Sequence, residues 1–321
     1  MAATRRLSEL RNAALESIDL PLEPIAVALS GGADSAILAW ASMESGSESR
    51  SIHVDHSLPA SGRLLQAAEE IASRLGIPFQ VLKLEPSLAA SEAEWRESRY
   101  AALEGALEPG EVLATGHTAD DQAETVLGNL LRGAGSSGLA GIPTRRGSVA
   151  RPLLGVWRSQ TRELSTLLGL PFHDDPANTD TDIRRNSIRM ELIPLLEERY
   201  NPRLRESLVR MARSIGSDET LLASIAAEAP IDLEPGRARV VAGVLRTLPR
   251  PVSARVVRTA LRWLRPPHPG TAAEVDAIHQ VALGATPRAE IEGGVVVRRE
   301  GAFVTLSSSG YLSGSTEEDD S

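Results

Sequence analysis

The chain of 321 residues is long enough for two domains, and its 42% hydrophobic and 24% charged residues are typical of a globular protein. It contains no cysteine, which excludes disulfides, thiolate metal sites and iron–sulfur clusters. A net charge of −9 opposes nucleic-acid binding by the molecule as a whole, and no apolar run reaches the ~20 residues of a membrane helix. Segment 1–18 lacks the apolar core of a signal peptide, so we expect a cytoplasmic protein without a membrane partner.

A glycine pair joins the first predicted strand to a predicted helix. Residues 25–29 (IAVAL) form an apolar run typical of a buried strand, and residues 36–43 resume as an apolar helix. Free backbone N–H groups and the helix dipole converge between them, which predicts a phosphate site at the turn Ser30, Gly31, Gly32, Ala33, Asp34 and Ser35. An ordinary β–α turn with a capping Ser or Asp is the alternative.

Strands and helices alternate through the first half of the chain. We expect strands at 25–29, 51–56, 79–85 and 111–117, with helices at 36–43, 63–75, 92–107 and 120–131. This order predicts an α/β fold with a doubly wound, mostly parallel sheet, whose ligand lies at the carboxyl ends of the strands. Three of these ends carry polar turns: Ser30-Gly31-Gly32, His53-Val54-Asp55 and Thr115-Gly116-His117.

Residues 116–125 (GHTADDQAET) gather acidic groups at the start of a predicted helix. His117, Asp121 and Glu124 are spaced i, i+4, i+7 and share one helical face. Carboxylates beside a phosphate-binding turn repel one another unless a cation lies between them, and Mg²⁺ binds through one or two carboxylates plus substrate phosphates. The pattern predicts a Mg²⁺ site with Asp34, Asp121 and Glu124, although an acidic turn that only complements the helix dipole is the alternative.

The turn that contains Asp34 also limits the type of phosphate chemistry. The chain has no GxxxxGK[ST] motif, so a Walker-type loop that transfers a γ-phosphate is excluded. An acidic residue in the turn suits a metal-bridged pyrophosphate leaving group. We therefore predict attack at the α-phosphate, which is adenylation.

The second half of the chain divides at Asn201-Pro202. We predict a catalytic domain at 1–200, a linking helix at 201–230, a smaller, mainly helical domain at 231–306 and a disordered acidic tail at 307–321. The Gly- and Ser-rich segment 133–150 predicts a functional loop or a crossover. In the smaller domain we expect a strand at 238–243, helices at 252–265 and 271–283, and a hairpin within 289–306.

A basic stripe marks the predicted helix 252–265. Eight arginines and no acidic residue lie between Pro235 and Ala273. Apolar residues cover one face of the helix, and the opposite face carries Arg255, Arg258, Arg262 and Arg265. Charge of one sign in an acidic protein predicts contact with RNA phosphates, whereas an ordinary solvated face is the alternative.

Several motifs together resemble a known family. SGGADS after a strand resembles the PP-loop of ATP pyrophosphatases that adenylate a substrate. From about residue 24 to about 202, motifs in the same order and at similar spacing resemble the bacterial tRNA(Ile)-lysidine synthetases. These motifs are HVDH (53–56), EAEWRESRY (92–100), ATGHTADDQAET (114–125), LLRGAGSSGL (130–139), RPLL (151–154) and DDPANTDTDIRRNSIRMELIPLL (174–196).

The resemblance implies a PP-loop, Rossmann-like fold and a specific reaction. ATP with Mg²⁺ adenylates the wobble cytidine of a tRNA(Ile) with a CAU anticodon, and free L-lysine then joins C2 of that base. The products are lysidine, AMP and pyrophosphate, and codon specificity changes from AUG to AUA. The chain resembles the short form of the family, and the sequence leaves open whether it forms a homodimer.

The resemblance also implies roles for residues that match the motifs. It implies ATP binding by Ser30, Gly31, Gly32, Ala33, Asp34, Ser35, Val54 and Gly116. It implies catalytic roles for Asp34, Arg96, His117, Asp121 and Glu124, and tRNA contacts for Arg99, Arg132, Arg185, Asn186 and Arg189. A solvated face remains the alternative for Arg96 and Arg99, and the segment with Arg185 and Arg189 could instead hold the last helix of the domain to its sheet.

Two other functions compete with this interpretation. A related PP-loop thiolase adds sulfur to a cytidine, and the absence of cysteine argues against it. A nucleotide- or RNA-binding relative with a decayed site is the other alternative. The presence of Asp34, Asp121 and Glu124 argues against decay.

Overall fold

The computed structural model describes residues 2–56, 61–84, 92–174 and 184–308 of the chain. The chain forms two compact units, Met1–Gly216 and Ser217–Ser321, and their boundary falls inside the long helix α10 (Leu204–Ala227). Among the described residues, no helix combines the length and the apolar character needed to cross a membrane. Most of the predicted acidic tail lies outside the described residues.

A six-stranded sheet forms the centre of the first unit, in the order β3-β2-β1-β4-β6-β5. Its strands are β1 (Ile25–Ala28), β2 (Ser49–Asp55), β3 (Phe79–Lys83), β4 (Val112–Ala114), β5 (Arg145–Arg146) and β6 (Val149–Ala150). Neighbouring strands are parallel except β5, which pairs antiparallel with β6. The prediction of a mostly parallel, doubly wound sheet is confirmed. The β5–β6 hairpin lies in the segment 133–150, which was expected to be a functional loop or a crossover.

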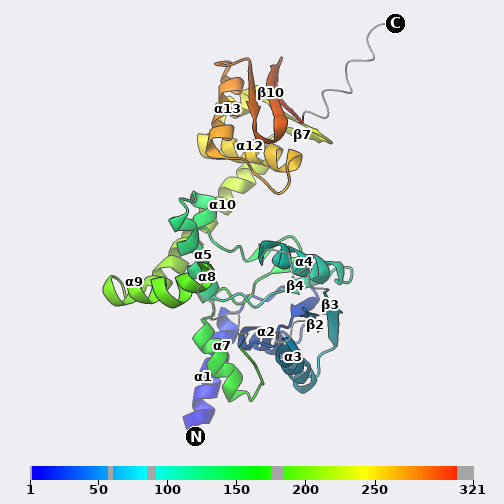
Figure 1. Cartoon of the computed structure of the whole chain (residues 1–321), viewed down its shortest axis with the longest axis vertical. Coiled ribbons are helices and arrows are strands. Elements are labelled where there is room, and N and C mark those ends of the chain that lie inside the picture. Colours follow the sequence, from blue (N-terminus) through cyan, green and yellow to red (C-terminus); the bar gives the residue numbers. More distant parts are fainter. Residues whose placement is uncertain (1, 57–60, 85–91, 175–183, 309–321) are drawn as a thin grey trace. The chain divides into compact units, whose positions relative to one another are not determined.

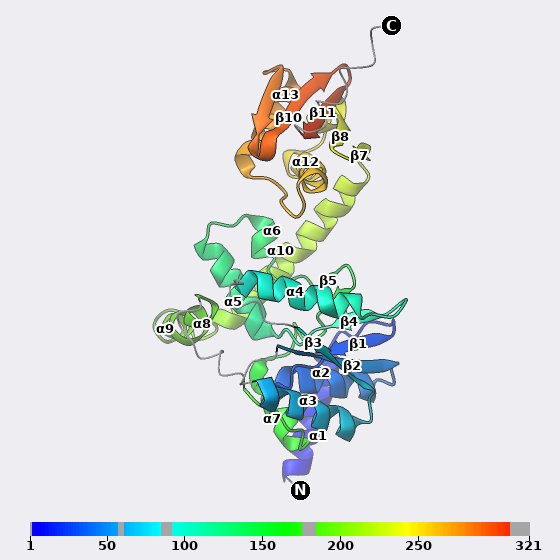
Figure 2. The same cartoon turned by 45° about the vertical axis from the view of Figure 1, so that its right-hand side comes forward.

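Helices cover both faces of this sheet because its central strand is apolar on both sides. Helices α1 (Ala2–Ser17), α2 (Ala33–Glu44), α3 (Ser61–Leu75) and α7 (Arg158–Leu167) lie on one face and α4 (Glu92–Gly105) on the other (Figures 1 and 2). Ile25, Val27 and Leu29 pack into the core on the α2 side, whereas Ala26 faces the core on the α4 side. This alternation is the period of two that a strand imposes.

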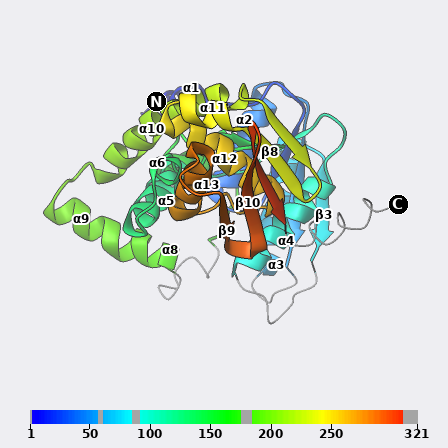
Figure 3. The same cartoon turned by 90° about the horizontal axis from the view of Figure 1, so that it is seen from above.

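A helical layer completes the first unit. It contains α5 (Ala119–Leu131), α6 (Ser136–Leu139), α8 (Arg184–Ser187), the π-helical turn η2 (Ile188–Leu192), α9 (Ile193–Arg199) and the first part of α10. Figure 3 shows α8 and α9 leading outward and α10 leading back. Val126 of α5 packs with Ile188, Ile193 and Leu208, so α5 is held against the helices that follow the sheet.

The second unit contains a five-stranded antiparallel sheet in the order β7-β8-β11-β10-β9. The strands are β7 (Ile231–Glu234), β8 (Arg237–Val241), β9 (Arg288–Ile291), β10 (Val295–Glu300) and β11 (Phe303–Ser308), and a short 3₁₀ turn, η3 (Glu292–Gly294), joins β9 to β10. The unit is therefore richer in strands than the mainly helical domain that the sequence predicts. The hairpin predicted within 289–306 is present and contains three antiparallel strands, β9, β10 and β11. The unexpected strand is β7, which has four residues, two of them acidic, so its apolar pattern is weak.

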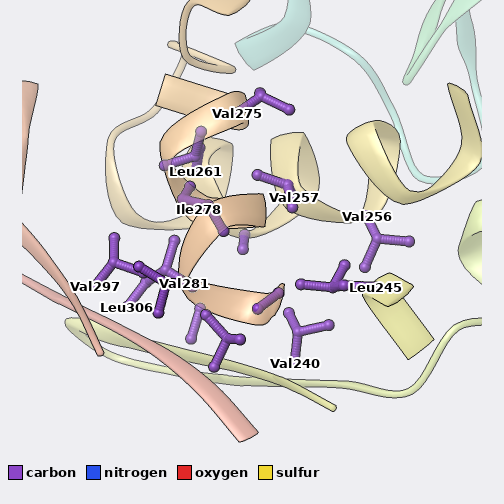
Figure 4. Close-up of a cluster of buried hydrophobic side chains, with 14 of the residues drawn as sticks. Val240, Leu245, Val256, Val257, Leu261, Val275, Ile278, Val281, Val297 and Leu306 are labelled. Carbon is purple, nitrogen blue, oxygen red and sulfur yellow. The ribbon is translucent and has the colours of Figure 1, made fainter. Parts of the chain in front are cut away.

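Three helices pack on this second sheet: α11 (Ala242–Thr247), α12 (Arg250–Leu264) and α13 (Ala272–Leu283). Leu261 of α12 and Ile278 of α13 share a buried cluster with Val297 and Leu306 of the sheet (Figure 4). The predicted helices at 252–265 and 271–283 are thus confirmed within a residue or two, and the apolar face of α12 is the buried one.

Candidate functional site

The turn between β1 and α2 depends on a glycine. Gly31 has φ +88°, and a Cβ there would lie 2.2 Å from the carbonyl oxygen of Leu64. The hydroxyl groups of Ser30 and Ser35 are 3.0 Å apart, and Ser35 Oγ donates to the Gly32 carbonyl at 2.9 Å. The turn is therefore tightly built and places the first backbone N–H groups of α2 at the carboxyl end of β1, as an anion site requires.

Two neighbouring strand ends lie beside this turn. A Cβ on Gly116, between β4 and α5, would lie 3.1 Å from the backbone nitrogen of Ser35, so the two turns are in close contact. Val54 lies near the end of β2, the strand on the other side of β1, and is 9% exposed. The carboxyl ends of β2, β1 and β4 are therefore adjacent, as the sequence predicts.

An arginine that the sequence analysis did not select lies among the predicted carboxylates. Arg158, the first residue of α7, places Nη2 2.6 Å from Asp121 Oδ1, Nη1 3.3 Å from Glu124 Oε1 and Nε 3.4 Å from Asp34 Oδ2. Thr161, one turn later, donates its hydroxyl to the Asp34 carboxylate. Asp34, Asp121 and Glu124 thus come together, as predicted, but around a guanidinium group.

Two further arginines reach the same carboxylates from α8 and η2. Arg185 Nη2 lies 2.6 Å from Asp121 Oδ1, and its Nε lies 3.0 Å from Glu124 Oε2. Arg189 Nε lies 2.6 Å from Glu124 Oε1. The predicted tRNA contacts of these two arginines stay predictions. We call these six residues, Asp34, Asp121, Glu124, Arg158, Arg185 and Arg189, the arginine–carboxylate cluster.

The protein stabilises the ionised forms of the residues in this cluster to different extents. Burial opposes the ionisation of Asp121, yet Arg158, Arg185 and the backbone N–H of Thr118, which donates at 2.7 Å, lower its pKa to about 2. Burial also disfavours the charged form of Arg158, but Asp121, Asp34 and Glu124 outweigh it and raise its pKa. Burial raises the pKa of Asp34 despite Thr161 and Arg158. The charge of Asp34 is therefore less well stabilised than that of Asp121.

The donor set suits one carboxylate ligand to Mg²⁺ better than three. Carboxylate oxygens are the ligands that Mg²⁺ prefers, and Asp34 adjoins the phosphate-type turn with 23% of its side chain exposed. Asp121 and Glu124 each accept from an arginine at 2.6 Å, whereas the guanidinium group of Arg158 lies farther from Asp34, at 3.4 Å. In the part of the chain that the structure describes, no group of three or more His, Asp or Glu residues is arranged to hold a metal ion. The donor set therefore fits a cation held at Asp34 rather than one held by all three carboxylates.

His117 is a neutral imidazole in this environment. Burial lowers its pKa to about 3; Asp121 opposes the shift, and Arg96, Arg151 and Arg185 add to it. Its Nδ1 lies 2.9 Å from Thr115 Oγ1, at the carboxyl end of β4. A neutral imidazole can exchange hydrogen bonds with a substrate without adding a charge.

The remaining residues predicted for the first unit are not all near this cluster. Arg96 and Arg99 are on α4, with their guanidinium carbons 5.2 and 5.9 Å from the centre of the Tyr100 ring. Asn186 is buried at the end of α8. Arg132 is exposed at the opposite end of α5 from Asp121 and donates to Asn129. Asn178, in the matched segment 174–196, lies outside the described residues.

Three of the four arginines of the basic stripe on α12 contact other groups of the second unit, so fewer of them are available to RNA phosphates than the sequence predicts. Arg255 pairs with Glu219, Arg258 Nη1 donates to the Gly270 carbonyl at 2.7 Å, and Arg265 Nη2 lies 2.8 Å from Glu274 Oε1. Among the four, Arg262 is exposed and has no such contact within the described chain. The acidic partners Glu219 and Glu274 lie outside the segment 235–273, so counting charges within that segment does not show these ion pairs.

Comparisons with known proteins agree with this geometry. Residues 3–196 match the model of the PP-loop domain family. A tRNA(Ile)-lysidine synthase from Nocardia farcinica is 39% identical over 244 residues, 75% of either chain. One from Salinispora tropica is 36% identical over 325 residues, which cover 95% of this chain and 96% of the relative. The solved U34-tRNA thiolase NcsA from Methanococcus maripaludis, with its [4Fe-4S] cluster, has a TM-score of 0.53 and 19% identity over 66% of this chain and 80% of its own, a likeness of fold alone.

Proposed function

The chain belongs to the tRNA(Ile)-lysidine synthases of the PP-loop family, and on that premise we propose that it joins free L-lysine to the wobble cytidine of a tRNA(Ile) with a CAU anticodon. ATP adenylates the O2 atom of the cytidine and releases pyrophosphate. The ε-amine of lysine then attacks C2 and displaces AMP. The observation that carries the proposal is the position of Asp34, whose backbone belongs to the anion-type turn and whose carboxylate belongs to the arginine–carboxylate cluster.

The phosphate turn supplies the binding of ATP in this proposal. The N–H groups at the start of α2 contact the phosphates, and Gly31 and Gly116 allow the close approach of the surrounding backbone. Asp34 would hold Mg²⁺, and the ion would supply positive charge to offset the charge of the leaving pyrophosphate. Val54, at the neighbouring strand end, lies by the adenine.

Lysine recognition is assigned to the arginine–carboxylate cluster. Asp121 and Glu124 hold guanidinium groups through charge-assisted hydrogen bonds, and a lysine ammonium group would bind them by displacing one of these guanidinium groups. Arg185, with 37% of its side chain exposed, suits the lysine carboxylate. A base with a pKa of about 3 is too weak to deprotonate an amine efficiently, so His117 orients the substrate by hydrogen bonding.

The decisive experiment measures transfer of radiolabelled L-lysine into an unmodified tRNA(Ile) transcript with a CAU anticodon, in the presence of Mg-ATP. We expect ATP-dependent label in this tRNA and none in a tRNA(Met) with the same anticodon. Asp34→Asn should abolish the label, whereas Glu163→Gln, an exposed carboxylate on α7, serves as the matched control. Absence of both label and AMP release from the wild type would refute the proposal.

Neither competing function has an observation in its favour. The chain contains no cysteine with which to bind a cluster or carry sulfur. The three carboxylates of the site are present and charge-paired, which does not suggest a decayed site.

A further inference from the structure

Arg151 is a buried arginine without a carboxylate partner. It directly follows β6 and is 8% exposed. Its Nη1 donates to the carbonyl of Pro143 at 3.0 Å, but its Nε is buried and makes no hydrogen bond. Burial lowers its pKa, and Tyr100 is the neighbour that opposes this shift. A buried guanidinium without a counter-charge is unfavourable, which indicates that an anion completes the site.

The surroundings of Arg151 add positive charge. Arg96 and Arg146 both act on it by like-charge repulsion, and both are exposed. Arg96 lies over the ring of Tyr100, the residue that also interacts with Arg151. Among the described residues, neither Arg96 nor Arg151 forms an ion pair with a carboxylate. This arrangement contrasts with the arginine–carboxylate cluster, where three guanidinium groups face three carboxylates.

The strand order places Arg151 on the side of the site away from the adenine. It lies at the carboxyl end of β6, two strands from the β1 turn in the order β2-β1-β4-β6. Strands are ~4.8 Å apart, so Arg151 is displaced by about 10 Å from the turn assigned to the ATP phosphates. Val54, which the proposed function places by the adenine, is on β2, on the opposite side. The β6 side therefore faces the second substrate.

We propose that Arg151, together with Arg96 and Tyr100, forms a phosphodiester-binding subsite that holds the RNA backbone beside the nucleotide being modified. The inference rests on the proposed function, because it takes the second substrate to be RNA. A planar guanidinium group suits a phosphodiester, which it can bind with two parallel hydrogen bonds. Its orientation is fixed in advance by the bond to Pro143.

The test compares Arg151→Gln with Arg145→Gln. Both variants remove one positive charge near the β5–β6 hairpin, but Arg145 is exposed and already paired with Glu23. For Arg151→Gln we expect affinity for the tRNA(Ile) transcript to fall about tenfold or more. The slope of log affinity against log salt should become shallower by about 0.7–0.9, the value for one lost phosphate contact. ATP binding without tRNA and the tRNA affinity of Arg145→Gln should match the wild type.

A second variant separates binding from a structural role. Arg151→Lys keeps the charge and should restore the salt slope of the wild type, whereas a role limited to holding Pro143 predicts the same salt slope in Arg151→Gln, Arg151→Lys and the wild type. An unchanged salt slope with a lowered melting temperature would overturn the inference. So would a fall in ATP affinity alone, which would assign the subsite to a nucleotide phosphate.

Lysine transfer by the wild type, measured in parallel, separates this inference from the proposed function. If the wild type transfers lysine and Arg151→Gln binds tRNA normally, the subsite alone is refuted. If the wild type binds tRNA through Arg151 but transfers no lysine, the proposed function alone is refuted.

Discussion

Gly31 combines a left-handed backbone with a close backbone contact, so it should not tolerate a side chain. Its φ of +88° disfavours any Cβ, and the added atom would meet the carbonyl of Leu64 at 2.2 Å. We expect Gly31→Ala to lower the free energy of unfolding by about 2 kcal/mol or more, and to weaken ATP binding. Urea denaturation and a direct ATP titration measure the two effects.

Gly76→Ala is the matched control for this variant. Gly76 also has a positive φ, +67°, but a Cβ there meets nothing within 4 Å. Gly76→Ala should lower the free energy of unfolding only by the cost of a Cβ in a left-handed backbone conformation, about 1 kcal/mol, and leave ATP binding unchanged. Equal losses for the two variants would mean that the contact with Leu64 is unimportant.

His279 should make the second unit sensitive to mild acid. It is buried between α12 and α13, with Nδ1 2.8 Å from the Val275 carbonyl and Nε2 2.8 Å from Ser253 Oγ. Burial lowers its pKa; Val275 and Asp276 oppose the shift and Arg250 adds to it. The unfolded chain therefore binds a proton near pH 6.5 before the folded state does, so stability is lost as the pH falls below about 6.5.

Melting temperatures at pH 7.5, 6.5 and 5.5 measure this effect. His279→Gln should reduce the pH dependence, although it also loses packing and is less stable at pH 7.5. His268→Gln, an exposed histidine of the same unit, should behave like the wild type. The prediction fails if the wild type and His279→Gln lose stability in parallel between pH 7.5 and 5.5.

Single residues also show where sequence analysis stops. The glycine turn and the acidic start of α5 could be identified because each is encoded within ten residues. Arg158 could not, since it is separated from Asp34 by 124 residues and from Asp121 by 37. A lone arginine at the start of a helix has no periodic pattern, and only the packing of α7 against α2 brings it to the carboxylates.

At the scale of elements, Arg158 joins α7 to α2 and α5. We expect Arg158→Met to lower the free energy of unfolding by about 2–4 kcal/mol, because Asp121 and Glu124 then lose one of their buried partners. Lysine transfer should fall as well. Arg162→Met, one turn further along α7, removes an exposed ion pair with Asp174 and should change stability by less than about 1 kcal/mol.

A double-mutant cycle tests whether the interaction is direct. The loss for Arg158→Met combined with Asp121→Asn should be smaller than the sum of the single losses by about 1 kcal/mol or more. Strictly additive losses, measured by urea denaturation, would contradict a direct interaction. Asn is chosen because its side-chain oxygen still accepts from the Thr118 backbone N–H.

Elements with a strong apolar period were the ones predicted well. The buried run of β1 and the apolar face of α12 appear in the structure as expected. The strand β7 was not predicted, because it has only four residues, two of them acidic, and its pairing with the neighbouring strand β8 leaves no apolar pattern in the sequence. The arginines of α12 were predicted as one surface, but their partners lie in α10 and α13.

At the scale of the whole molecule, two compact units with separate cores should unfold separately. We expect two transitions in differential scanning calorimetry. Leu38 is in the core of the first unit and Leu261 in the core of the second. Leu38→Ala and Leu261→Ala should each lower the temperature of one transition and reduce the free energy of unfolding of that unit by about 2–5 kcal/mol.

ATP provides an independent assignment of the two transitions. A ligand that binds only one unit stabilises only that unit, by about 2.7 kcal/mol at a hundred times its dissociation constant. Saturating Mg-ATP should therefore raise the transition that Leu38→Ala lowers. If either variant lowers the temperatures of both transitions by the same amount, the two units unfold together.

The arginine–carboxylate cluster also constrains how such a protein can change over evolutionary time. Each carboxylate forms an ion pair with at least one guanidinium group, and Arg158 contacts all three carboxylates. Replacing one of the six residues leaves a neighbouring charge without a partner. A single substitution therefore lowers stability even where a second substitution would restore the pairing of charges. Lineages should therefore exchange these positions in compensating pairs or keep them all, and the six residues should diverge as one inherited block.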